Sequence, residues 1–228
     1  AALRRAAEKA GIKILGLHWI LSKTTGLHLT TDDRDMRRRT AVYLGELARL
    51  CEELGGDIMI FGSPGQRSIT EEKNVAISMH QAYRNAAEVL KQAVPALDKT
   101  GVTLAMEPLT TWETNFLLTS GDAVRLAKMV DSPKVKMMLD CKAMWGAEID
   151  DIPTLIRRRK DWMAHFHVND PNLRGPGFGK LDFVPILKTL KEIKYDDWVS
   201  VEAFDYYPTP ERMTVESLKY LKKCETRA

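Results

Sequence analysis

Four short apolar runs each carry one residue of a metal-ligand type at or near the carboxyl end: VTLAMEPL (102–109) with Glu107, VKMMLD (135–140) with Asp140, MAHFHVND (163–170) with His167, and WVSVEAF (198–204) with Glu202. Successive ligand-type residues are 33, 27 and 35 residues apart, which is about the length of one strand plus one helix. Enzymes built on a (β/α) barrel place their chemistry at the carboxyl ends of the strands. The spacing therefore predicts one site at the mouth of such a barrel.

Runs typical of strands alternate with runs typical of helices along the whole chain. The short apolar strands are those expected where helices cover a parallel sheet. There is no linker and no low-complexity stretch, so we expect a single domain over residues 1–228. Beyond the four quoted runs, we expect strands at 12–20 and 57–62, a short helix opening at Asp151, and longer helices at 2–10, 32–54, 68–98, 120–130, 184–194 and 209–223.

The fold class that this alternation predicts is α/β, specifically a (β/α)8 TIM barrel. A Rossmann sheet is the competing fold, but no GxGxxG motif follows any of the expected strands. A closed barrel needs eight strands and typically about 250 residues. Six strands are visible, and the chain begins at Ala1 rather than at a methionine. We therefore expect an N-terminally incomplete barrel that lacks its first two strands.

Composition limits the classes of partner. The net charge is +3 with both signs interspersed, so nothing points to nucleic acid, and the basic runs at 37–39 and 157–160 are interpreted as solvated helix faces. No apolar run approaches the length of a membrane span. The three cysteines show no paired spacing, which favours a reducing compartment and a cytoplasmic location. We expect no nucleic-acid partner and no membrane.

The ligand types favour a hard cation and proton-transfer chemistry. Two glutamates, an aspartate and a histidine suit Mn²⁺ or Mg²⁺ better than a thiolate-binding metal, with Co²⁺ and Zn²⁺ as further candidates. Moving a proton next to a carbonyl requires an acid, a base and a group that stabilises the enediolate oxygens. A divalent cation supplies that stabilisation. Glu107 and Glu202 are the expected acid and base as well as metal ligands.

Several neighbouring residues are candidates for substrate contact, and each has a structural alternative. His165 shares a strand face with His167 and is equally consistent with a hydrogen-bonded histidine inside the barrel. His18 ends the first expected strand and either contacts substrate or bonds a loop. Lys142 either binds a substrate oxyanion or lies exposed on the rim. Trp112 either walls a sugar pocket or packs a loop.

Almost the whole chain resembles the xylose-isomerase-like sugar phosphate isomerase/epimerase superfamily. In the related ketose 3-epimerases, residues that match Glu107, Asp140, His167 and Glu202 hold the metal, and the two glutamates also move the proton. Glu113 matches a substrate-binding glutamate of those enzymes. The segments that carry the resemblance are GLHWIL (16–21), FGSPGQR (61–67), LAMEPLTTWETNF (104–116), MMLDCKAM (137–144), HFHVNDPNLRGPGFG (165–179) and VSVEAFDY (199–206).

Two positions depart from the epimerase pattern. Ala143 stands where those enzymes have a substrate-binding histidine, and Leu173 stands where they have an arginine, with Arg174 one position later. The resemblance implies a metal-dependent sugar (phosphate) isomerase or epimerase that acts on a small carbohydrate substrate, and we expect a homodimer or homotetramer. The alternatives are an inosose-type dehydratase on the same metal site, an endonuclease IV-like DNA repair enzyme, and a catalytically inactive barrel. Endonuclease IV uses three zinc ions and many histidines, and Ala143 replaces one of its metal histidines.

Overall fold

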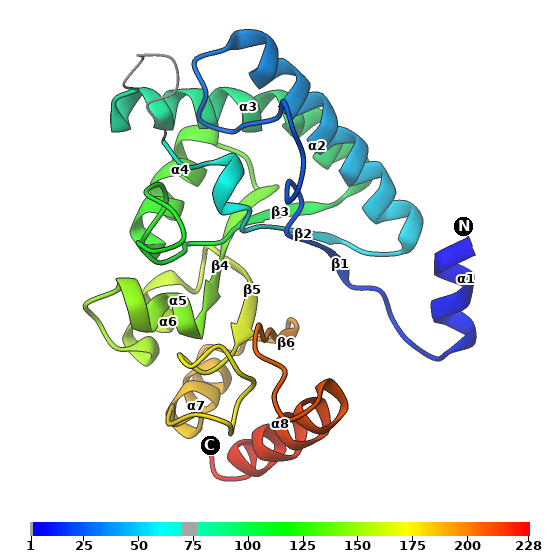
Figure 1. The fold of residues 1–228 in the computed structure, drawn as a ribbon, viewed down its shortest axis with the longest axis vertical. Coiled ribbons are helices and arrows are strands. Elements are labelled where there is room, and N and C mark those ends of the chain that lie inside the picture. Colours follow the sequence, from blue (N-terminus) through cyan, green and yellow to red (C-terminus); the bar gives the residue numbers. More distant parts are fainter. Residues whose placement is uncertain (1, 70–76) are drawn as a thin grey trace.

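The strands form one parallel sheet whose order follows the chain. The computed structural model describes residues 2–69 and 77–228. In that part of the chain each strand pairs in parallel with the next, which confirms the predicted parallel barrel architecture. Figure 1 shows the curved sheet with the helices packed along its outer side. The strands are β1 (Gly16–His18), β2 (Ile58–Phe61), β3 (Thr103–Met106), β4 (Val135–Asp140), β5 (Met163–Val168) and β6 (Val199–Val201).

Helices follow the strands and cover the sheet from outside. α1 lies at the edge of the fold, near the C-terminal end of α2 (Figure 1). None of the helices in the described ranges combines the length and the apolar character that a bilayer span requires. The helices are α1 (Ala2–Lys9), α2 (Arg34–Leu54), the 3-10 helix η1 (Pro64–Gln66), α3 (Met79–Thr100), α4 (Ser120–Val130), α5 (Cys141–Ala147), α6 (Ile152–Arg159), α7 (Val184–Glu192) and α8 (Pro210–Glu225).

Alternation along the strands separates two apolar layers. In β2, Met59 and Phe61 belong to the large core that packs against the helices, whereas Ile58 and Ile60 belong to a small separate cluster with Ala105 and Met138. Successive strand residues point to opposite faces, so this small cluster lies on the inner face of the sheet. The inner face of the sheet therefore carries an apolar layer in addition to the polar residues at the strand ends.

Helix ends are fixed by local capping chemistry. The Asp33 carboxylate accepts a hydrogen bond from the Met36 N–H at 3.0 Å, and Gly55 ends α2 with a φ of 88°. Thr119 and Asp122 form a reciprocal capping box at the start of α4. Connections from helix to strand are short, as at 55–57 between α2 and β2, whereas the loops that follow the strands are longer, as at 107–119 between β3 and α4.

Three local predictions require correction. The strand expected at 12–20 is limited to Gly16–His18, because Trp19 has a φ of 56° and leaves the extended conformation. The start of the helix expected at 68–98 lies partly outside the described residues. α3 begins at Met79 instead, after Ser78, whose hydroxyl accepts a hydrogen bond from the Gln81 N–H. The short helix α5 was not predicted.

Candidate metal and active site

The four predicted ligands meet at the carboxyl ends of their strands. Glu107 follows β3, Asp140 ends β4, His167 lies in β5, and Glu202 follows β6. His167 Nδ1 lies 3.2 Å from Glu107 Oε1, 3.4 Å from Glu202 Oε2 and 3.8 Å from Asp140 Oδ2. Three carboxylates from three different strand ends therefore surround one ring nitrogen.

His18 joins this cluster from the other edge of the sheet. Its Nε2 atom lies 2.9 Å from Glu202 Oε1. His18, Glu107, His167 and Glu202 each offer a ligand atom, and these atoms all lie within 4.8 Å of one another. Asp140 reaches the same cluster with Oδ2, while its Oδ1 accepts a hydrogen bond from the Ala143 N–H at 2.7 Å and caps α5. The sequence had suggested His18 as either a substrate contact or a residue that bonds a loop.

Burial, repulsion between carboxylates and hydrogen bonds to His167 set the pKa values in the cluster. Burial raises the pKa of Asp140 to about 7, and the nearby Glu202 and Glu107 carboxylates add to the rise. Burial alone would lower the pKa of His167, but hydrogen bonds with Glu107 and Glu202 outweigh it and raise the pKa to about 10. Crowded carboxylate oxygens and imidazole nitrogens at a buried point are a donor set that fits a divalent cation.

Asn169 links the carboxylates to the backbone of α5, and the sequence reasoning missed it. Its Nδ2 donates to Asp140 Oδ2 at 2.6 Å and to Glu202 Oε2 at 3.4 Å. Its Oδ1 accepts a hydrogen bond from the Lys142 N–H at 2.8 Å. Outer partners of this kind orient metal-binding carboxylates. The only available sequence signal was its position two residues after His167, on the same face of the chain.

Two of the predicted substrate contacts form an ion pair beside the cluster. Lys142 Nζ lies 2.8 Å from Glu113 Oε1, and Thr110 donates to Glu113 Oε2 through both its backbone N–H and its hydroxyl. Lys142 Nζ also lies 4.6 Å from the centre of the Phe204 ring. Burial opposes the charge on Lys142, but Glu113 outweighs it and raises the lysine pKa. Lys142 is therefore a buried, fixed cation rather than an exposed rim lysine.

The remaining predicted contacts lie in different environments. The His165 ring is 5.1 Å from the His167 ring, and burial, followed by the charges of His167 and His18, lowers the pKa of His165 to about 4. Arg174 Nε lies 2.8 Å from Asp205 Oδ2, so its charge is already paired. Trp112 is 80% exposed on the rim.

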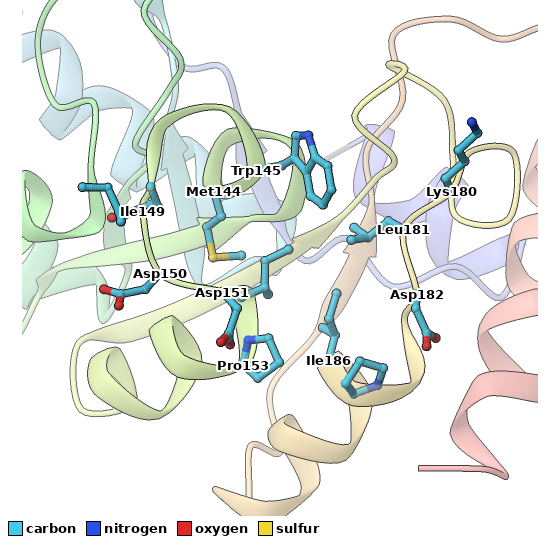
Figure 2. A pocket seen from close by; sticks show the side chains of 13 residues that line it. Met144, Trp145, Ile149, Asp150, Asp151, Pro153, Lys180, Leu181, Asp182 and Ile186 are labelled. Atoms are coloured by element: carbon cyan, nitrogen blue, oxygen red, sulfur yellow. The ribbon is translucent and has the colours of Figure 1, made fainter.

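A separate pocket of about 530 Å³ lies outside the barrel between the start of α6 and the start of α7 (Figure 2). Apolar side chains such as Met144, Leu181 and Ile186 form much of its wall. Its acidic residues already have structural partners: Asp151 caps α6 and Asp182 accepts a hydrogen bond from the Val184 N–H. None of the four predicted metal ligands lines this pocket. We therefore place the candidate site at the carboxylate cluster.

Comparison with known proteins agrees with this fold. A family model described as a xylose isomerase-like TIM barrel matches residues 1–224. A probable ketose 3-epimerase from Synechocystis sp. is 24% identical, over 97% of this chain and 80% of that protein. The D-psicose 3-epimerase of Ruminiclostridium cellulolyticum is 25% identical, over 78% of this chain and 59% of that protein.

The fold is also close to that of solved structures. The crystal structure of 3-keto-D-glucoside 4-epimerase from E. coli matches with a TM-score of 0.84. The match covers 97% of this chain and 83% of that chain, at 19% sequence identity. At this identity the likeness concerns the fold.

Proposed function

The chain belongs to the xylose isomerase-like TIM barrel family, and on that premise we propose that it is a divalent-metal-dependent sugar isomerase or epimerase. The observation that carries this proposal is the convergence of Glu107, Asp140 and Glu202 on His167 Nδ1 at the mouth of the barrel. The names of the curated relatives, which are sugar epimerases, support the same reaction class.

The proposed metal ligands are Glu107, Asp140, His167 and Glu202, with His18 as a further nitrogen donor beside Glu202. A bound divalent cation would stabilise negative charge that develops on the substrate oxygens. Asn169 would hold Asp140 and Glu202 in place through its side-chain amide. Mn²⁺ and Mg²⁺ are the cations that this oxygen-rich set fits best, followed by Co²⁺ and Zn²⁺.

The proposed proton-transfer groups are the two glutamates. Glu107 approaches the cluster from the end of β3, and Glu202 approaches it from the end of β6, three strands further along the sheet. If one carboxylate removes the proton from the carbon next to the carbonyl and the other donates a proton to the opposite face of that carbon, the reaction is epimerisation. If one carboxylate moves the proton between adjacent carbons of a cis-enediolate, the reaction is aldose–ketose isomerisation.

The substrate contacts proposed next to these groups are Glu113, Lys142, His165 and His18, with Arg174 and Trp112 further out on the rim. The Lys142–Glu113 pair presents a fixed donor and acceptor to sugar hydroxyls. A neutral His165 ring is able to donate and accept a hydrogen bond at the same time. The substrate class that these groups suit is a small polyhydroxylated carbonyl compound.

Solvent exchange tests the proposed reaction directly. We expect the metal-loaded protein to incorporate deuterium next to the carbonyl of an accepted ketose or aldose in D₂O, because the proton passes through an exchangeable carboxylate. Incubation with ketoses, aldoses and inososes, followed by NMR of the products, measures this. Loss of water from an inosose would indicate the dehydratase instead. No exchange with any of these compounds in the presence of Mn²⁺, Mg²⁺, Co²⁺ or Zn²⁺ would contradict the proposal.

Metal binding is expected to raise thermal stability. A cation that binds only the folded state contributes about 2.7 kcal/mol at a free concentration 100 times its Kd. For a chain of this size, each kcal/mol shifts Tm by about 2–4 °C. Dialysis against EDTA and then titration with Mn²⁺, with KCl of matched ionic strength as the control, measures the shift. A Tm that none of the four candidate cations changes would rule out a site of useful affinity.

A further inference from the structure

The segment FGSPGQR (61–67), which follows β2, surrounds the polar groups of Glu107. The Glu107 N–H donates to the Phe61 carbonyl at 3.1 Å. The Glu107 carbonyl accepts a hydrogen bond from Arg67 Nη1 at 2.6 Å. The Glu107 carboxylate lies against Gly62, where an added Cβ atom would be 2.4 Å from Oε2. The amide, the carbonyl and the carboxylate of one residue are therefore all placed by the same short segment.

Arg67 is the buried anchor of this arrangement. Its side chain is fully buried, and it also donates to the Phe61 and Leu117 carbonyls, each at 3.4 Å. It thus ties together the end of β2, the end of β3 and the loop after β3. Its Nε atom has no hydrogen-bond partner among the described residues. Burying a guanidinium is costly. Here the Arg67 N–H groups donate to the backbone carbonyls of Phe61, Glu107 and Leu117.

Gly62 provides the space for the carboxylate. The atoms closest to an added Cβ would be Glu107 Oε2, Glu107 Cδ at 3.5 Å and Trp19 Cδ1 at 3.7 Å, all of them side-chain atoms. The φ of Gly62 is not in the left-handed region. An alanine here would consequently leave the backbone unstrained and displace mainly the end of the Glu107 side chain.

We propose that Gly62 and Arg67 are positioning residues that set the location of the Glu107 carboxylate. Gly62 acts through the absence of a side chain, and Arg67 acts through the backbone carbonyl of Glu107. The importance of that location for metal binding and proton transfer rests on the proposed function. Residues 61–67 contact Glu107 in the same way whatever reaction the Glu107 carboxylate performs.

Gly62→Ala and Gly65→Ala form a matched pair of variants in one segment. An added Cβ at Gly65 meets nothing within 4 Å. We expect Gly62→Ala to lower kcat by about 10–100-fold, since misplacement of a reacting group by about 1 Å costs up to this much. We also expect about tenfold weaker Mn²⁺ binding in calorimetry, as is typical when the support of a ligand is disturbed. Gly65→Ala should match the parent in both, and the two variants should unfold at the same temperature.

Arg67→Met and Arg67→Lys separate positioning from stability. Met removes the charge and every hydrogen-bond donor, whereas Lys keeps the charge and a single donor nitrogen. We expect Arg67→Met to weaken Mn²⁺ binding about tenfold and Arg67→Lys to recover part of that loss. A purely structural role would lower Tm in both variants and leave the Mn²⁺ affinity of the folded protein unchanged.

Crystal structures of the two glycine variants provide a readout that does not depend on activity. The proposal predicts a displaced Glu107 carboxylate in Gly62→Ala and an unmoved one in Gly65→Ala. If the two variants agree in carboxylate position, Mn²⁺ affinity and kcat, the proposal is overturned. If the carboxylate moves while Mn²⁺ affinity and turnover stay the same, Gly62 does position Glu107, and the role given to Glu107 in the proposed function is wrong.

Discussion

Replacing either Glu107 or Glu202 by glutamine is expected to lower kcat by about 10²–10⁴-fold, which is the usual contribution of a positioned acid or base. Glutamine keeps the shape and the hydrogen-bonding reach of the side chain but cannot take up a proton. Both carboxylates lie within 3.4 Å of His167 Nδ1, so each faces the point where metal and substrate are proposed to meet. Steady-state kinetics on a substrate that the parent protein accepts measures the loss.

Metal content is the necessary control, because an amide also coordinates a divalent cation more weakly than a carboxylate. Each variant should be assayed at saturating Mn²⁺, with bound metal quantified in the same sample. Glu46→Gln on the exposed side of α2 makes the same chemical change far from the site and should leave kcat unaltered. A variant at position 107 or 202 that retains its metal and turns over normally would reduce that glutamate to a ligand only.

The positions of the proposed metal ligands were predictable because consecutive parallel strands have their carboxyl ends side by side. Residues spaced by one strand and one helix in the sequence therefore lie close together. Once the runs ending near Glu107, Asp140, His167 and Glu202 are taken as consecutive parallel strands, their carboxyl ends must lie on the same rim. No knowledge of side-chain packing is needed for that step. The alternation of β5 likewise places His165 and His167 on one face, and the structure has their rings 5.1 Å apart.

The supporting contacts were not predictable, because they depend on register and on distances between loops. Asn169 bonds Asp140 across the β4–β5 pair, where a register shift between Met137 and Met138 changes which residues are neighbours. The pairing of Lys142 with Glu113 joins α5 to the loop after β3, between residues 29 positions apart. Nothing in the periodicity of either segment specifies these contacts.

The roles of Gly62 and Asp140 illustrate a second limit of sequence reasoning. A glycine after a strand commonly indicates a turn, whereas Gly62 is required by the close approach of a carboxylate from the next strand. Asp140 was predicted as a ligand, and it also caps α5 through the Ala143 N–H. That second role explains why α5, a helix that the sequence analysis did not predict, follows β4 directly.

Phe166→Ala is expected to reduce the free energy of unfolding by about 3–5 kcal/mol, the usual cost of removing a buried phenylalanine from a core. Phe166 is fully buried, pairs with Val199 in β6, and belongs to the large core on the outer side of the sheet. Urea denaturation measures the loss. Leu218→Ala on α8 is the control, because that leucine is 52% exposed and its truncation should cost little.

The Phe166→Ala variant tests whether stability and site geometry change independently. Phe166 lies between His165 and His167 in the sequence but faces away from them. If the truncated side chain leaves β5 in register, Mn²⁺ should stabilise Phe166→Ala by the same increment as the parent, since the ligands are untouched. A smaller increment would mean that packing on the outer face of β5 sets the position of His167 on the inner face. A loss of less than about 1 kcal/mol would contradict the tight packing that a fully buried phenylalanine implies.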